Sequence, residues 1–405
     1  MMITCWYAAI AEETPTGDED PKEKTEVIDV HGKRYLGRLR RLTAAGVELE
    51  TPQHVTLAID DVLRLVGARH SKRPPPHSSM VFLANGDRLA VRPTAMDEEN
   101  LNGTWLSFPD RPAVSIPLET VRGIVVDVPG FSKARRRVVR NLLAVRHSTD
   151  VVILKNADRV SGTLADVSSK SLTLETATGQ STIPREGILA VAFSSDLISF
   201  PNARGRRAIV SLVDGSRITA AELDLDTSGI LSMRGLFGAK LQFPFDAVES
   251  IVFLGGRAVF VSDLDPIDYE FRPYLSQKHA LVRDYNVRGG PLVLRGIEYA
   301  KGLGMHSRSA VTYQLDREFH SFLSMAGIDD GARRQGSVEF AVEVDGKRVY
   351  SSALQQGGEP AVRVGPIDLR GKQTLTLVVE FGQRGDIGDF ADWCDAVIVR
   401  EPAEE

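Results

Sequence analysis

The chain has 405 residues, of which 42% are hydrophobic and 25% charged, and its formal net charge is −5 at pH 7. This composition is typical of a globular protein with several cores and excludes a fibrous chain. No run approaches the roughly eighteen apolar residues that a membrane-spanning helix needs. The only cysteines, Cys5 and Cys394, exclude a disulfide framework or a cysteine-based zinc site within the chain.

The first 24 residues do not predict folded structure. Ile3 to Ile10 is weakly apolar and ends in a small-residue pattern like a cleavage site, although the basic start of a secretory signal is missing. Glu12 to Lys24 is acidic and almost free of large apolar side chains, which predicts disorder. We therefore expect residues 1–24 to be a disordered tail or the remnant of an export signal.

Four stretches of about fifty residues share one layout. Each has an apolar strand, a polar turn, further strands, and a Pro or acidic residue before a last hydrophobic strand. The clearest copy begins with Val151 to Leu154 and ends with Ile188 to Phe193, whereas the first copy is the most degenerate. Each unit has room for five short strands, which make a small β-barrel. The layout resembles the Sm-like and SH3-like barrels. The predicted repeats cover residues 25–67, 78–128, 149–196 and 205–256, and a polyproline segment at residues 74–76 separates the first two.

A basic segment from Lys133 to Leu143 lies between the second and third repeats. Sm-like proteins often bind RNA, so its arginines suggest contacts with phosphates. Val138, Val139 and Leu142 recur at helical spacing, however, which favours an amphipathic linker helix over residues 129–148 with the arginines toward solvent. The near-neutral barrels and the absence of an aromatic platform also argue against nucleic acid.

The last third of the chain alternates between apolar and polar residues. Ser337 to Val344 has this alternation, breaks at Asp345-Gly346 and resumes through Lys347 to Tyr350, which is typical of a β-hairpin. Val311 to Leu315 and Gln373 to Phe381 supply further strands. An antiparallel β-sandwich follows from this pattern.

Three motifs in this region resemble signatures of the NPCBM/NEW2 family, a carbohydrate-binding module found beside family-98 glycoside hydrolases. They are Tyr299 to Ser307 at a strand entry, Ala326 to Asp330 at a turn, and Asp389 to Trp393 near the end. Their order and spacing agree with the family from about Ala258 to Val399. The resemblance implies that residues 258–401 form a galactose-binding-like jelly roll whose loops at one end hold a sugar. The expected fold is thus all-β, with tandem small barrels followed by a jelly-roll β-sandwich.

Sugars are bound by planar polar groups on their hydroxyls and by an aromatic face on the sugar ring. His306, Asp392 and Trp393 supply these groups, and we expect them to form the binding set. Asp329 and Asp330 would shape the neighbouring loop, and Arg283 lies on an early loop that would join them. Structural interpretations stay open: Trp393 as a core residue and His306 as a loop cap.

Aspartates recur at every third position near the end of the chain, at Asp386, Asp389, Asp392 and Asp395. Calcium is held by several carboxylate and carbonyl oxygens, and family members sometimes carry a structural calcium. The spacing is not that of an EF-hand. Asp386 and Asp389 are therefore the candidate ligands of a structural calcium, and a solvated acidic loop is the alternative.

We expect a non-catalytic protein, because the sequence has no nucleophile elbow, P-loop, zinc-protease helix or dinucleotide fingerprint. The expected partner is a glycan or polysaccharide, and the resemblance implies export to the periplasm or the exterior. The alternative is a scaffold protein whose jelly roll has lost sugar binding and whose barrels contact proteins through edge strands. Phe390 favours this alternative, because family members often carry a histidine there. An enzyme accessory subunit and a degenerate hydrolase follow in that order.

Overall fold

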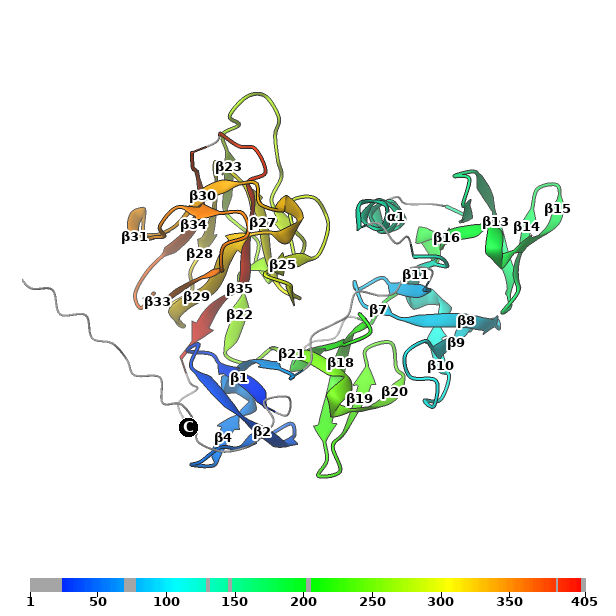
Figure 1. The fold of residues 1–405 in the computed structure, drawn as a ribbon, viewed down its shortest axis with the longest axis horizontal. Coiled ribbons are helices and arrows are strands. Elements are labelled where there is room, and N and C mark those ends of the chain that lie inside the picture. Colours follow the sequence, from blue (N-terminus) through cyan, green and yellow to red (C-terminus); the bar gives the residue numbers. More distant parts are fainter. Residues whose placement is uncertain are drawn as a thin grey trace, which may run out of the picture.

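The computed structural model describes residues 24–68, 78–128, 132–144, 148–201, 205–383 and 385–401 (Figure 1). The predicted tail, apart from Lys24, and the polyproline segment lie outside these residues. Within the described ranges nearly all regular structure is strand, joined by one α-helix and short 3₁₀ turns, so the all-β fold class is confirmed. No helix in these ranges is long and apolar enough to cross a membrane.

Repeats 1, 3 and 4 have five strands each, repeat 2 has six because its second strand is interrupted at Ala90, and in every repeat a 3₁₀ turn precedes the last strand. Repeat 1 contains β1 (Thr25–Asp29), β2 (Arg34–Leu42), β3 (Gly46–Glu50), β4 (Val55–Ala58) and β5 (Val62–Val66). Repeat 2 contains β6 (Met80–Leu83), β7 (Arg88–Leu89) running on into β8 (Val91–Met96), β9 (Asn100–Trp105), β10 (Val114–Pro117) and β11 (Val121–Val125). Repeat 3 contains β12 (Asp150–Leu154), β13 (Arg159–Val167), β14 (Ser171–Thr176), β15 (Gly179–Pro184) and β16 (Ile188–Ala192). Repeat 4 contains β17 (Arg207–Leu212), β18 (Arg217–Leu225), β19 (Ile230–Gly235), β20 (Lys240–Pro244) and β21 (Val248–Leu254).

The sharp bend before the fifth strand has a local cause in three repeats. Pro117, Pro184 and Pro244 each end the fourth strand and lead into the 3₁₀ turn. Proline fixes φ near −65° and has no N–H to donate to a sheet, so it ends the strand and favours the turn. This is the Pro that the sequence places before the last hydrophobic strand of repeats 2, 3 and 4, whereas the turn of repeat 1 carries the acidic Asp60 and Asp61 instead.

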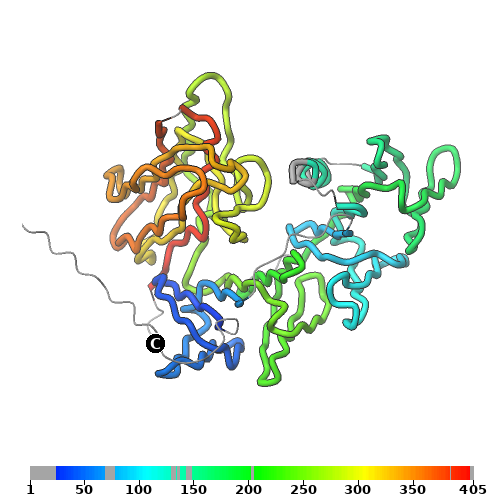
Figure 2. The backbone as a smooth tube through the Cα atoms, in the orientation of Figure 1, coloured from blue at the N-terminus to red at the C-terminus, as the bar shows by residue number. Residues whose placement is uncertain are grey.

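The repeats associate in nested pairs rather than in chain order (Figure 2). The fifth strands of repeats 2 and 3 pair antiparallel, with Ile124 opposite Val191. The fifth strands of repeats 1 and 4 do the same, with Leu65 opposite Ile251. We call these contacts the 2·3 seam (β11 and β16) and the 1·4 seam (β5 and β21). Each seam joins two barrels into one continuous sheet, which fills the hydrogen bonds that two strand edges would otherwise leave open.

The helix α1 (Ser132–Ala144) covers the 2·3 seam. Leu142 is buried there, and Val138 and Val139 pack beside it against Val125 and Ala190 of the two fifth strands. Arg140, on the same helix, is exposed. The apolar face predicted from the helical spacing therefore packs on the barrels.

The C-terminal domain consists of two facing antiparallel sheets (Figure 1). The first contains β24 (Val282–Arg283), β27 (Gly302–His306), β35 (Phe390–Arg400), β29 (Phe319–Ile328) and β33 (Val362–Asp368), with β22 (Ala258–Phe260) on β35. The second contains β23 (Asp268–Phe271), β28 (Ser309–Gln314), β34 (Thr374–Phe381), β30 (Ser337–Val344) and β31 (Lys347–Ser351), with β32 (Gln355–Gln356) on β30. A separate hairpin joins β25 (Leu292–Leu294) to β26 (Ile297–Tyr299).

The jelly roll lies on the 1·4 seam, as α1 lies on the 2·3 seam. Its residues Phe260, Val397 and Val399 form one buried cluster with Leu63 of repeat 1 and Val252 of repeat 4. One of the differences between the two seams lies at the third residue of the fifth strand, directly after its bulged residue. This position is glycine in β11 (Gly123) and arginine in β5 (Arg64).

Arg64 makes a buried polar contact between the barrels and the jelly roll. It is 3% exposed, and its Nη1 donates to Asp395 Oδ2 on β35 at 3.0 Å. Its Nη2 donates to the carbonyl oxygen of Glu298 at 3.2 Å, and Arg88 of repeat 2 pairs with the Glu298 carboxylate at 2.6 Å. In the 2·3 seam, a β-carbon on Gly123 would lie 2.6 Å from Leu142 Cδ1. The space that the Arg64 side chain fills in the 1·4 seam is therefore filled by α1 in the 2·3 seam.

Candidate functional site

The signature residue His306 lies at the end of β27, opposite Phe390 on β35. Its ring is 4% exposed and stacks on the ring of His279, with centroids 4.0 Å apart and planes 4° apart. Burial lowers the pKa of His306, and burial together with the neighbouring His306 charge lowers that of His279. Both rings are therefore neutral at pH 7. His306 lies beneath His279, which is the more accessible of the two.

Trp393 is fully buried between the two sheets. Its ring meets Phe340 edge-on, with a centroid distance of 5.1 Å, and lies 6.4 Å from Phe322. This position matches the core interpretation and leaves no face of the ring for a sugar. Trp393 holds the two sheets together beneath the loops.

Asp392 is also fully buried, on the opposite face of β35. Neither of its oxygens accepts a hydrogen bond from an N–H or O–H group in the described part of the chain. Burial raises the pKa of Asp392 well above its ordinary value, and the neighbouring Asp329 charge raises it further. Burial thus favours the protonated form of Asp392, whose carboxyl group interacts with that of Asp329.

Asp329 and Asp330 fasten the β25–β26 hairpin to the end of β29. Asp329 accepts hydrogen bonds from Val293 N at 3.0 Å, Gly331 N at 2.7 Å and Asn286 Nδ2 at 3.0 Å. Asp330 accepts from Arg295 N at 3.1 Å and Gly296 N at 2.8 Å, at the tip of the hairpin. The pair shapes the loop next to it.

Arg283 and the two candidate calcium ligands have separate partners. Arg283 forms an ion pair with Asp265 at 3.0 Å. Asp389 is buried and accepts from Ser307 Oγ and from Ser337 N, while Asp386 is half-buried on the loop before it. Burial raises the pKa of Asp389 to about 6. In the described ranges no three metal-binding side chains gather, so the calcium site stays a prediction.

A pocket of about 490 Å³ opens at the loop end of the sandwich, above the carboxylates just described. It is lined by Arg295, Asp330, Arg333, Arg334 and Gly358. Arg295 lies at the hairpin tip, Arg333 and Arg334 follow the 3₁₀ turn Asp330–Ala332, and Gly358 lies between β32 and β33. The guanidinium of Arg295 donates to the Gly358 carbonyl oxygen at 3.0 Å and closes one wall. We call this the arginine pocket.

Of the residues predicted from sequence, only Asp330 lines the arginine pocket. Sequence reasoning missed Arg295, Arg333 and Arg334. Arg333 and Arg334 lie three and four residues after Asp330 of the signature, and this proximity is the signal that could have pointed to them. The signature residues themselves are mostly buried and hold the loops in place.

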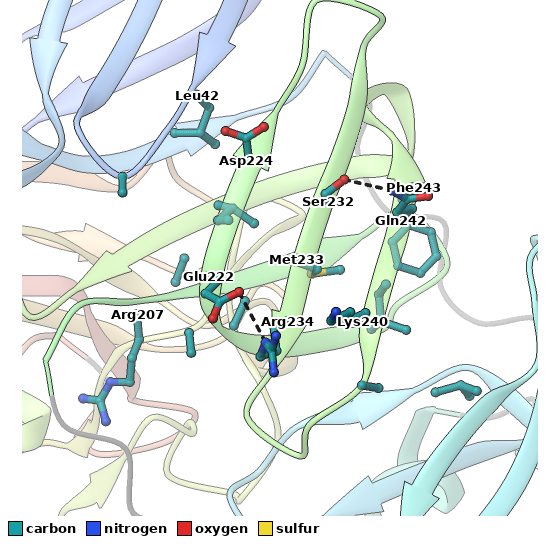
Figure 3. Close-up of a pocket in the computed structure, with 18 of the residues that line it drawn as sticks. Leu42, Arg207, Glu222, Asp224, Ser232, Met233, Arg234, Lys240, Gln242 and Phe243 are labelled. Carbon is teal, nitrogen blue, oxygen red and sulfur yellow. Dashed lines mark hydrogen bonds and ion pairs between the residues drawn. The ribbon is translucent and has the colours of Figure 1, made fainter.

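A larger cavity of about 870 Å³ lies among the barrels (Figure 3). Its walls come mainly from β18, β19 and β20, with Leu42 of repeat 1 and Trp105 of repeat 2. Polar groups along it pair with one another, as Arg234 does with Glu222 at 3.3 Å and Gln242 with Ser232 at 3.1 Å. This cavity lies among the barrels, whereas the arginine pocket lies at the loop end of the sandwich beside the signature residue Asp330, so the arginine pocket is the better candidate for a ligand despite its smaller volume.

The two sheets and the loop-end pocket define the C-terminal domain as a jelly-roll β-sandwich of the binding-module type. Residues 257–399 match the family model of the NPCBM/NEW2 domain, which confirms the resemblance for this part of the chain. The match covers the C-terminal domain and leaves the four barrels outside it.

Curated relatives of the chain include two glycosidases. One protein, named as an endo-alpha-N-acetylgalactosaminidase of Renibacterium salmoninarum, is 32% identical over 108 residues, or 27% of this chain and 7% of that protein. Alpha-1,3-galactosidase B of Akkermansia muciniphila is 30% identical over 115 residues, or 28% of this chain and 14% of that protein. The chain thus spans a small part of these relatives.

Among solved structures, a CBM51 module of Clostridium perfringens GH95 in complex with methyl-galactose is 25% identical. The alignment covers 35% of this chain and 99% of the module, with a TM-score of 0.32. The family match supports a carbohydrate-binding role for the C-terminal domain.

Proposed function

We propose that the jelly roll binds a glycan in the arginine pocket and that the domain does not catalyse a reaction. The observation that carries this proposal is the lining of the pocket: guanidinium groups and a carboxylate converge at the loop end of a family-matched binding module. Guanidinium groups donate in-plane hydrogen bonds that fit pairs of sugar hydroxyls.

The lining of the pocket also supports the non-catalytic part of the proposal. Glycoside hydrolysis commonly needs two carboxyl groups, about 5 to 10 Å apart, across the scissile bond. Asp330 is the one carboxylate among the described residues that line the pocket, and both of its oxygens accept backbone N–H groups of the hairpin. Asp330 therefore holds the hairpin tip in place through these hydrogen bonds.

The test is a glycan array probed with the full chain and with Arg334→Ala. Arg334 is exposed, so its loss should leave the fold intact and weaken glycan binding by about tenfold, the typical contribution of a charge-assisted hydrogen bond. Arg370→Ala is the matched control, because Arg370 is an exposed arginine that pairs only with Asp368. A blank array, or equal loss in both variants, would contradict the proposal.

The scaffold role is the second candidate, and the interface between the barrels and the jelly roll favours it. Arg64 and Arg88, from two different repeats, both hold the hairpin that carries Arg295. In this reading the barrels keep the module in a fixed orientation and contact protein partners through their remaining edges. Export would follow from a glycan ligand outside the cytoplasm, and cell fractionation tests it.

A further inference from the structure

The arginine pocket carries an excess of positive charge. Three guanidinium groups line it against one carboxylate, Asp330. The Asp330 oxygens are occupied by backbone N–H groups, and the nearby carboxylate of Glu359 accepts from Gln356 N at 2.8 Å. These two carboxylates are thus hydrogen-bonded to backbone N–H groups and form no ion pair with the pocket arginines among the described residues.

Arg333 and Arg334 differ from most other arginines on the jelly roll. Neither guanidinium has a hydrogen-bond or ion-pair partner among the described residues, and both side chains are exposed. Elsewhere on the domain, arginines pair with acidic residues: Arg272 with Glu270, Arg283 with Asp265, Arg308 with Glu380, Arg348 with Glu343, Arg370 with Asp368 and Arg400 with Glu318. Arg317 is also exposed and has no acidic partner among the described residues, so Arg333 and Arg334 are distinguished by being adjacent to each other and lining a pocket.

The backbone conformation around Arg333 and Arg334 fixes the point from which their side chains extend. Arg333 has a positive φ of 61° immediately after the 3₁₀ turn, so the chain reverses between Asp330 and Arg334. Gln335 N donates to the Ala332 carbonyl oxygen at 3.0 Å and Gly357 N to that of Gly336 at 3.2 Å, which ties this reversal to the neighbouring loop. The two arginines thus emerge from a hydrogen-bonded turn.

We propose that the ligand of the arginine pocket is an anionic sugar, one that carries a carboxylate or a sulfate ester, and this inference rests on the proposed glycan-binding function. Guanidinium groups bind carboxylate and sulfate oxygens through paired, charge-assisted hydrogen bonds, which are about twice as strong as neutral ones. The hydroxyls of a neutral sugar would leave the positive charge of the pocket uncompensated.

The experiment compares matched probes on the full chain by titration calorimetry. Galactose 6-sulfate is set against galactose, sialyllactose against lactose, and an oligogalacturonate against its methyl ester. We expect the charged member of at least one pair to bind about tenfold or more tightly, and to weaken as salt rises. The galactose 6-sulfate pair tests for recognition of a sulfate ester, and the sialyllactose and oligogalacturonate pairs test for recognition of a carboxylate.

The variant Arg333→Gln/Arg334→Gln removes two charges from the pocket. Arg348→Gln/Arg370→Gln is its control, because it removes two charges from paired, exposed arginines on the same domain. We expect the pocket variant to lose the preference for the charged probe and the control to keep it.

Two results would overturn this inference. Equal binding of the charged and the neutral probes, lost in the pocket variant, would leave the proposed function standing and refute the preference for an anion. Failure of every charged and neutral probe to bind a well-folded chain would refute both proposals.

Discussion

Asp389 shows how a single buried carboxyl can make the stability of this domain depend on pH. It joins the start of β35 to the β27–β28 corner through Ser307 and to β30 through Ser337. Burial raises its pKa from 3.8 to about 6 in the folded state. The folded protein therefore holds this proton at pH values where the unfolded chain has released it.

The sign of the effect follows from this difference. The stabilising contribution of the proton is fully present below pH 3.8 and is lost as the pH rises through about 6. In Asp389→Asn no carboxyl titrates, so the free energy of unfolding should change less between pH 4 and pH 7 than in the wild type. Urea unfolding at a series of pH values measures this. An unchanged slope in the variant would contradict the prediction.

For single residues, the sequence predicts which side chains lie near the loop end of the sandwich more reliably than it predicts what those side chains do. Trp393, Asp392 and His306 were found because strand alternation and the family motifs place them next to a loop. Burial, which decides whether a side chain contacts a ligand, depends on the hairpin of β25 and β26 and on His279, which come from other parts of the chain. The unpaired arginines have no periodic pattern that would identify them.

The helix α1 is the element whose role is clearest from its spacing. Leu142 fills the space above Gly123, where a β-carbon would clash. Its truncation in Leu142→Ala leaves a cavity in this seam and should lower the free energy of unfolding by about 2 to 5 kcal/mol. Chemical denaturation of the full chain measures the loss.

The control for this prediction is Arg140→Ala on the exposed face of the same helix, which should change stability by less than about 0.5 kcal/mol. Equal effects of the two substitutions would mean that α1 does not pack on the barrels as described.

Elements were easier to predict than their pairing. Local alternation, together with the proline before the last strand in three of the repeats, indicates five-stranded units. The nested pairing of repeats 1 with 4 and 2 with 3 depends on which fifth strands meet, and all four fifth strands are similarly apolar. Nothing within one repeat specifies its partner, so the sequence predicted a string of barrels where the structure has two joined pairs.

At the scale of the whole molecule, Arg64 and Asp395 link the barrels to the jelly roll through a buried ion pair at 3.0 Å. Removal of one partner leaves the other charge buried and uncompensated, so Arg64→Leu should cost about 3 to 5 kcal/mol, and Asp395→Leu a similar amount. The double variant should recover part of this loss because no buried charge remains. A double-mutant cycle on the full chain measures the coupling.

The exposed pair Arg370 and Asp368 is the control, with an expected coupling of about 0 to 1 kcal/mol. Additive losses at Arg64 and Asp395 would show that this ion pair does not help to hold the two domains together.

The difference between Gly123 and Arg64 has a consequence for assembly. The 1·4 seam and the 2·3 seam are nearly equivalent surfaces within one chain. In a misassembled molecule, α1 would pack on the 1·4 seam and the jelly roll on the 2·3 seam. An arginine beneath the helix would collide with a leucine and find no carboxylate, while a glycine beneath the jelly roll would strand a buried aspartate. A single side chain thus makes the exchanged arrangement costly and gives each seam its own cover.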